Sequence, residues 1–186
     1  MQKKIIAIAV ITIFVIALLY FYRTPTISRY NFEQNKLYSP AYGKVETILH
    51  NKEKNLIRIS IFLDINDIHS QYYPSNGMLL SRQTIPGKYE IATQNSNTVN
   101  NARTITKIVT PYQDIVTIEQ VSGLIARKIS DGGQKVGATV SVGEYLGRIH
   151  LGSRVNIIFS DDWEPTVAVG DIVRGPDSEI AKLRVN

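Results

Sequence analysis

An uninterrupted apolar stretch near the N-terminus constrains this chain most. Residues 5–22 carry no charge, and Thr12 is nearly the only polar side chain among them. As an α-helix, the stretch would be about 27 Å long, close to the hydrocarbon thickness of a bilayer. A helix buried inside a globular fold is more often amphipathic than uniformly apolar. We therefore predict one transmembrane helix and a single-pass membrane location.

A cleaved signal peptide is the alternative interpretation of this stretch. Such a peptide needs small residues at its cleavage point, and the sequence Tyr-Phe-Tyr-Arg-Thr-Pro at residues 20–25 does not provide them. The aromatic residues 20–22 instead suit the interfacial belt of a membrane protein. We expect an uncleaved anchor over residues 1–23. Basic residues flank both ends in similar numbers, so the positive-inside rule leaves the side of the membrane open.

The chain beyond the apolar stretch changes character twice. Residues 24–36 form a polar linker, and residues 37–186 form one domain by length. Short runs rich in Val, Ile and Tyr recur in this domain, often bounded by Gly, Pro or Asn. The runs cover residues 45–49, 56–63, 107–110, 115–121, 124–129, 145–149 and 155–159.

This pattern predicts a mainly β domain, a compact β-sandwich or barrel. Gly43 and Gly123 each precede an apolar run, as in the barrel-sandwich hybrid architecture of lipoyl-like domains. Helical periodicity is scarce outside the apolar stretch. We expect one short terminal helix over residues 177–183 and a loop over residues 94–103, which are rich in Asn and Thr.

Composition excludes several classes of function. The chain has no Cys, so disulfides and Cys-based metal sites are ruled out. Its three histidines, His50, His69 and His150, are far apart in sequence, and we predict no metal site. The formal net charge is +5, but the basic residues are scattered and not interleaved with aromatics. This argues against nucleic-acid binding and suits attraction to an anionic lipid surface.

Four segments, taken in order, carry a family resemblance. They are Ser39-Pro40-Ala41-Tyr42-Gly43-Lys44-Val45; Arg58-Ile59-Ser60-Ile61-Phe62-Leu63 followed by Asp67-Ile68-His69 and Pro74; Pro86-Gly87-Lys88-Tyr89 followed by Asn101-Ala102-Arg103; and Gly147-Arg148-Ile149-His150-Leu151-Gly152-Ser153-Arg154-Val155. Together they resemble the pyruvoyl-dependent phosphatidylserine decarboxylase proenzymes, and they span roughly residues 39–159. One Gly-Ser dipeptide would mean little, whereas four motifs in the right order and spacing are specific.

The resemblance implies a definite chemistry. Ser153 would attack the carbonyl of Gly152, and the chain would be cut between them to leave a pyruvoyl cofactor at the former Ser153. A Gly at the acceptor position allows close approach to the backbone. The cofactor would then support decarboxylation of a phospholipid substrate, phosphatidylserine, to phosphatidylethanolamine. His69 is the implied acid–base residue, because an imidazole titrates near neutral pH.

The sequence departs from the family at two positions around that histidine. The family's Asp, which would orient the His, is Tyr42 here, and a second His found in some members is Tyr72. A phenol can hold a histidine but cannot stabilise an imidazolium as a carboxylate does. Asp67 could substitute, because in a strand it would lie on the same face as His69. We expect Tyr42 and Tyr72 to form a repacked aromatic pair.

Two further residues complete the predicted site. Asn101 and Arg103 match the ends of the family's Asn-Glu-Arg element, whose Glu is Ala102 here. His150 precedes the cleavage segment where the family usually has Lys or Arg, so we expect a basic side chain near the cleft.

Two other functions stay open at this point. One is a pseudoenzyme that keeps the fold and binds a lipid or a partner without cutting itself. The other is a membrane-anchored barrel-sandwich adaptor, although the chain has no long heptad region and no biotin-type Met-Lys-Met motif. The sequence leaves the oligomeric state open.

Overall fold

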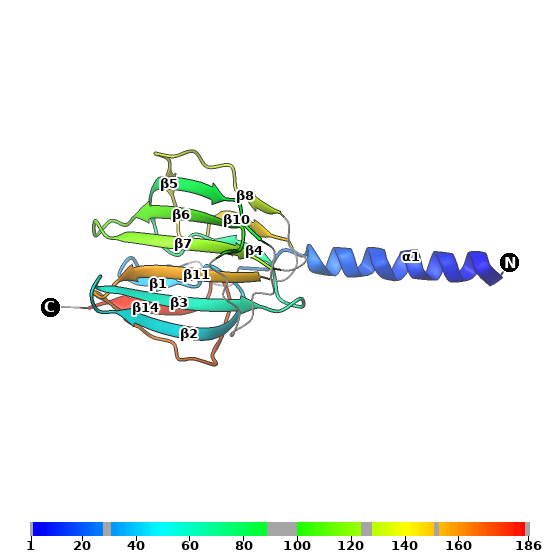
Figure 1. The fold of residues 1–186 in the computed structure, drawn as a ribbon, viewed down its shortest axis with the longest axis horizontal. Helices are drawn as coiled ribbons and strands as arrows, with labels where there is room; N and C mark the ends of the chain where they lie inside the picture. The colour runs from blue at the N-terminus through cyan, green and yellow to red at the C-terminus, as the bar shows by residue number, and fades with distance from the viewer. Residues whose placement is uncertain (1, 28–30, 89–99, 124–127, 151–152, 185–186) are drawn as a thin grey trace.

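The computed structural model describes residues 2–27, 31–88, 100–123, 128–150 and 153–184. A single straight helix, α1 (Gln2–Phe21), projects from one end of a β domain (Figure 1). Among the described residues, it is the one helix long and apolar enough to cross a membrane. Its side chains are exposed except for Phe21 at its end. The helix therefore touches the domain only where the chain enters it.

The β domain consists of three antiparallel sheets. The largest has eight strands in the order β13-β2-β3-β11-β7-β6-β5-β9 and is strongly curled. The two small sheets have the orders β1-β14-β12 and β4-β10-β8. The strand bounds are β1 Lys36–Tyr38, β2 Gly43–Asn51, β3 Leu56–Leu63, β4 Ser70–Tyr72, β5 Gly77–Ile85, β6 Arg103–Val109, β7 Ile115–Ser122, β8 Ile129–Asp131, β9 Thr139–Val140, β10 Tyr145–Ile149, β11 Ser153–Ser160, β12 Trp163–Pro165, β13 Ile172–Val173 and β14 Glu179–Leu183.

Alternating apolar residues build the core. In β3, every second residue from Ile57 to Leu63 is fully buried, as are Val155, Ile157 and Phe159 in the adjacent β11. The two strands pair in register, with Val155 opposite Ile61 and Ile157 opposite Ile59. Burying each such side chain stabilises the fold by roughly 1.5–3 kcal/mol, which fixes the register of β11. The position of Ser153 at the start of β11 follows from this register.

The mainly β architecture confirms the expected fold class, and β3 and β10 have the predicted bounds. The terminal helix expected over residues 177–183 is wrong, because this segment forms β14 between β1 and β12. Its Ile180 and Ala181 are fully buried there. Pairing and burial in the sheet therefore override the local preference of this segment for a helix. Residues 94–99 of the expected loop and 124–127 of an expected strand lie outside the described residues.

One glycine allows β2 and β3 to approach each other closely. Gly43, at the start of β2, has φ of +146°, and a Cβ there would lie 2.1 Å from the carbonyl oxygen of Phe62. Only glycine allows this approach between β2 and β3. One end of the domain, where α1 joins it, brings several elements together (Figure 1). These are the end of β3, the strands β4 and β10, and the start of β11.

Candidate active site

His69 lies at the end of the domain next to α1. It follows the turn after β3 and directly precedes β4, and its side chain is fully buried. Its Nδ1 is 2.9 Å from the carbonyl oxygen of Asp67. Since a carbonyl only accepts hydrogen bonds, Nδ1 donates the proton and Nε2 keeps its lone pair. This tautomer is the one that a general base requires.

The surroundings of His69 keep it neutral. The pKa of His69 is lowered to about 4, chiefly by burial and in part by the positive charges of Arg148 and Arg23, against the opposing effect of its hydrogen bond to the Asp67 carbonyl. The imidazole is therefore uncharged at neutral pH and available to accept a proton. The same burial makes the imidazolium costly, which limits its strength as a base.

Asp67 does not occupy the strand expected of it. It lies in the turn after β3, and its carboxylate accepts a 2.8 Å hydrogen bond from the backbone N–H of Asp64. The premise that Asp67 and His69 share a strand face is wrong, because the chain reverses there instead of extending. Burial raises the pKa of the Asp67 carboxyl. Asp67 contacts His69 through its backbone carbonyl, and its side chain shapes the turn that presents this carbonyl.

Tyr42 and Tyr72 are near each other. The backbone N–H of Tyr72, in β4, donates to the carbonyl of Pro40, so β4 lies along the segment that contains Tyr42. Burial raises the pKa of Tyr72 to about 12, with the Ser70 hydroxyl opposing this and Tyr42 adding to it. Burial and the charge of Asp177 raise the pKa of Tyr42 as well. Both phenols are neutral, so neither replaces the charge of a carboxylate.

The predicted cleavage segment is bracketed by contacts to the His69 region. Residues 151–152 lie outside the described residues. Before them, the backbone N–H of Ile149 donates to the carbonyl of His69 over 3.2 Å. After them, Ser153 opens β11 and pairs through its backbone with Leu63, the last residue of β3. The chain is therefore held by His69 before residues 151–152 and by the end of β3 after them.

Asn101, just before β6, bonds to the end of β7, the strand that pairs with Ser153. It is almost fully buried, and its Nδ2 donates a 2.8 Å hydrogen bond to the carbonyl of Ser122. Ser122 pairs through its backbone with Ser153. Arg103, at the start of β6, pairs with Val121, one residue before Ser122. Both predicted supporting residues thus lie beside the end of β7, whose last residue pairs with Ser153.

Sequence reasoning missed a buried polar network around His69. Gln120 donates to Gln71 over 2.9 Å, and Gln71 donates to the carbonyl of His69 over 2.7 Å. Arg148 donates to the hydroxyl of Ser70 over 2.6 Å. All four side chains are buried or nearly so, and buried hydrogen-bonded networks hold a site in one conformation. The sequence signal was a polar side chain at an inward position of an apolar strand, as at Gln120.

His150 is also held by hydrogen bonds. Its Nδ1 is 2.9 Å from the hydroxyl of Tyr22, and its Nε2 is 3.3 Å from the hydroxyl of Ser130. Burial lowers the pKa of His150, and Arg148 and Lys128 lower it further. Burial and these neighbouring cations disfavour the imidazolium, and so act against the basic side chain expected here.

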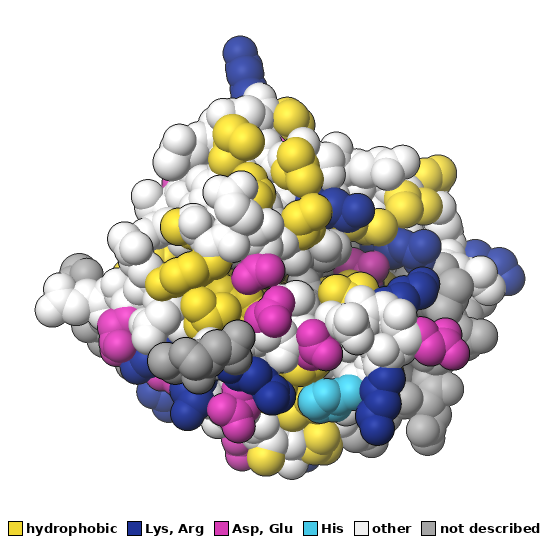
Figure 2. Space-filling view, turned by 90° about the vertical axis from the view of Figure 1, so that its left-hand side faces the viewer, with side chains coloured by type: hydrophobic (Ala, Val, Ile, Leu, Met, Phe, Trp, Pro, Cys, Tyr) yellow, Lys and Arg dark blue, Asp and Glu magenta, His cyan; other side chains and the backbone are white. Residues whose placement is uncertain are grey.

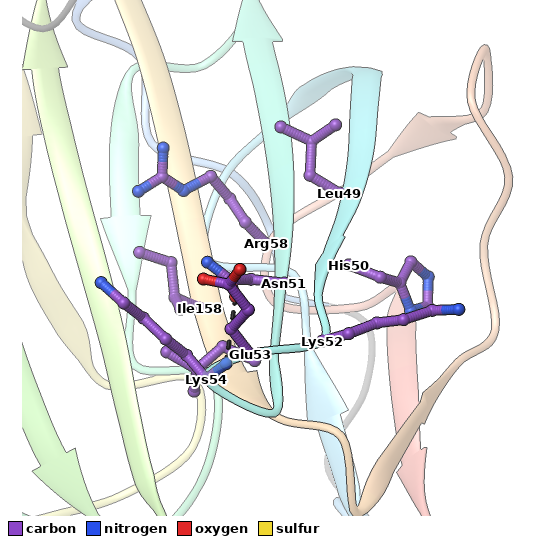
Figure 3. Close-up of a pocket in the computed structure, with 9 residues that line it drawn as sticks. Leu49, His50, Asn51, Lys52, Glu53, Lys54, Arg58 and Ile158 are labelled. Atoms are coloured by element: carbon purple, nitrogen blue, oxygen red, sulfur yellow. Dashed lines mark hydrogen bonds between the residues drawn. The ribbon is translucent and has the colours of Figure 1, made fainter.

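The described surface also has a hollow away from the candidate site. The face turned away from α1 (Figure 2) mixes side chains of both charges with apolar ones. A hollow of about 740 Å³ lies by the hairpin between β2 and β3 (Figure 3). It is lined by Leu49, His50, Asn51, Lys52, Glu53, Lys54, Leu56, Arg58 and Ile158, none of which belongs to the predicted site. His50 is exposed there.

Comparison with known proteins gives one consistent result. The family model described as phosphatidylserine decarboxylase matches residues 18–181. A phosphatidylserine decarboxylase proenzyme of Solibacter usitatus is 36% identical over 146 residues, covering 77% of this chain and 69% of the relative. The proenzyme of Amoebophilus asiaticus is 35% identical over 172 residues, covering 89% and 75%. That of Ralstonia nicotianae is 30% identical over 177 residues, covering 93% and 80%.

Proposed function

The chain belongs to the phosphatidylserine decarboxylase family, and from this membership we propose that it cuts itself between Gly152 and Ser153 and then decarboxylates phosphatidylserine. The observation that carries the proposal is that the chain before the cleavage segment bonds to His69, and the chain after it pairs with the end of β3. Ile149 bonds to the backbone of His69, and Ser153 pairs with the strand that leads to it. A neutral buried imidazole thus lies at the same end of the domain as the backbone of Ser153.

The proposed cleavage balances without an outside oxidant. The Ser153 hydroxyl adds to the Gly152 carbonyl and loses its proton, and the Gly152–Ser153 C–N bond breaks to give an ester and a free amine. Loss of the Cα proton breaks the Cβ–O bond and releases the Gly152 carboxylate. Water then hydrolyses the resulting imine, with loss of ammonia, and leaves a pyruvoyl group. His69 is the proposed acceptor of the first proton.

The residues present fit such a group. The network of Gln120, Gln71 and Arg148 is a buried polar surround beside the start of β11, and His69 in it has an N–H held by a carbonyl. The pyruvoyl carbonyl would take up the electron pair released as CO₂ leaves the substrate. The roles left to the chain are to exclude water and to hold a proton at Nε2 of His69.

The absence of the family's Asp changes how His69 would be oriented. Here the carbonyl of Asp67 holds Nδ1, which fixes the ring but offers no full negative charge to an imidazolium. In Ser-His-Asp triads the acid is worth up to about four orders of magnitude in rate. We therefore propose slow self-cleavage, with Asn101 and Arg103 as supports of the neighbouring strands.

Residues 1–23 are proposed as an uncleaved anchor, residues 24–36 as a linker and residues 37–186 as the catalytic domain. The apolar helix supports this division, because it is long enough to span a bilayer. So does Phe21, which is buried against the domain and would be lost if the helix were removed. A signal peptide has no reason to pack into the mature fold.

The direct test is the intact mass of the purified wild-type chain with time. We expect a small fragment that starts at position 153 and is lighter by one ammonia than a fragment starting with Ser. Ser153→Ala should abolish cleavage and His69→Gln should slow it strongly, while His50→Gln, at an exposed histidine on the far face, should behave as wild type. A wild-type chain that stays whole across a range of pH would defeat the proposal.

A second candidate is a pseudoenzyme that binds phosphatidylserine without cutting itself. The neutral phenols of Tyr42 and Tyr72, at positions where the family has ionisable groups, favour it. Its signature is an uncut chain that still binds vesicles containing phosphatidylserine better than neutral vesicles. Family membership leaves the adaptor interpretation without support.

A further inference from the structure

The end of α1 is built into the candidate site. The backbone N–H of Tyr22 donates to the carbonyl of Leu18 over 2.9 Å, so the helical hydrogen bonding runs one residue past Phe21. Arg23 then donates to the carbonyl of Tyr20 over 2.8 Å and to that of Asn66 over 2.6 Å. The first bond closes the helix, and the second ties it to the turn that presents Asp67. The helix end and the site turn therefore form one connected piece.

Two aromatic side chains from this helix end cover the two histidines of the site. The ring centroids of Phe21 and His69 are 4.6 Å apart, and Phe21 is only 5% exposed, unlike the rest of α1. The hydroxyl of Tyr22 is 2.9 Å from Nδ1 of His150. The guanidinium of Arg148 lies 5.2 Å from the centroid of the Tyr22 ring. Each aromatic residue thus contacts a different histidine.

These contacts exceed what a tether needs. A helix that served only as a membrane anchor would need no specific contact with the domain. Phe21, in contrast, is buried against the ring of His69. An aromatic ring at this distance excludes water from the imidazole face and restricts its rotation. The charged groups that act on His69 from the surrounding elements are Arg23 after α1, Arg148 on β10 and Asp64 in the turn, alongside the Asp67 carbonyl.

We infer that Phe21 and Tyr22 are positioning residues that form one wall of the candidate active site, with Phe21 acting on His69 and Tyr22 on His150. The catalytic role of this wall rests on the proposed function, but its structural part does not. The inference gives α1 a second task beside anchoring. Removal of the helix would open the site to water on the side of His69.

The test uses the full-length Ser153→Ala chain in detergent micelles, so that cleavage cannot complicate it. The chain has only three histidines, so a histidine-labelled sample gives three resolvable NMR titrations, assigned with His50→Gln and His150→Gln. In Phe21→Ala, the pKa of His69 should rise by about one unit or more, toward its ordinary value, as water enters. Phe21→Leu should restore most of the low pKa. Tyr22→Phe should shift His150 and leave His69 in place.

Leu19→Ala is the matched control, since Leu19 lies on the same helix turn but its side chain is 69% exposed. It should leave all three titrations unchanged. The inference would be overturned if His69 in Phe21→Ala titrated as in the parent chain while the other two histidines also titrated as before. A His69 shift as large in Leu19→Ala as in Phe21→Ala would overturn it too.

The same substitutions in the cleavable chain separate this inference from the proposed function. With cleavage, Phe21→Ala should move the pH profile of the cleavage rate in the direction of the His69 pKa, and Phe21→Leu should move it back. A chain that never cleaves but shows the NMR shift keeps the wall and defeats the proposed function. If Phe21→Ala cleaves with the same pH profile as the chain without this substitution, the proposed function stands and the role of Phe21 in it is refuted.

Discussion

Arg154 bonds to Glu46 across an intervening strand. Its Nη2 lies 2.7 Å from the Glu46 carboxylate, and each side chain is only 10% exposed. Arg154 is on β11 and Glu46 on β2, with β3 between them in the sheet. The residue directly after Ser153 is thereby clamped to the far side of β3, which stabilises the start of β11 where the proposed cleavage occurs.

Breaking this pair should destabilise the domain. Arg154→Met removes the guanidinium from a largely buried carboxylate, and we expect a loss of about 3–5 kcal/mol in the free energy of unfolding. The double variant Glu46→Leu, Arg154→Met removes both charges and should recover most of that loss. Thermal unfolding in detergent measures it. Lys182→Met, at a pair that is 54% exposed on both sides, is the control and should change little. An Arg154→Met chain as stable as the control would contradict the clamp.

Burial of neutral His69 should make stability depend on pH. The folded pKa is about 4, below the ordinary 6.5, so the unfolded chain binds a proton more readily in this window. The stabilising effect is complete above pH 6.5 and is lost as the pH falls toward 4. Wild type should lose about 3 kcal/mol over this window relative to His69→Gln. Unfolding curves at several pH values measure the difference, and parallel curves for the two chains would show that His69 is not buried as described.

Asp67 should act through its turn and not through its charge. An Asn at this position can still accept the bond from the backbone of Asp64, so Asp67→Asn should cleave at close to the wild-type rate. Asp67→Ala loses that bond, worth about 1 kcal/mol in comparable caps, and should cleave more slowly. The rate of appearance of the small fragment measures both. Equal damage in the two variants would instead assign the role to the carboxylate.

Tyr42→Asp tests whether the site has been rebuilt around the aromatic pair. The new carboxylate would lie in a partly buried place near Asp177, which disfavours its charge, and His69 is already oriented by a carbonyl. We expect no faster cleavage than in wild type. Tyr42→Phe keeps the ring and should cleave normally. A clear acceleration in Tyr42→Asp would show that the acid has simply been lost. His69→Ala should not cleave in either background.

The apolar helix should hold the chain in membranes. Washing with carbonate and with high salt should leave full-length protein in the membrane fraction, because salt screens surface charge but not apolar burial. N-terminal analysis of this fraction should find residues 1–23 still attached. Release of full-length protein by salt alone, or a mature chain that begins after residue 23, would rule out the anchor.

The sequence by itself determined the parts that local patterns encode. The uncharged run at residues 5–22 is sufficient to specify an apolar helix. The length of the run and the free energy of transferring its side chains from water to lipid depend on these residues alone. The alternation in residues 56–63 specifies a strand with one buried face in the same way, and the ordered motifs identify the family.

Only the tertiary structure decided how the site is assembled. Residues 177–183 form a strand because two distant strands pair with them, and the Asp67 carboxylate faces a turn because the chain reverses after β3. No local pattern shows that Phe21, 48 positions before His69, would pack on its ring. Such contacts depend on how the sheets close, and that closure is set by register and burial summed over the whole domain.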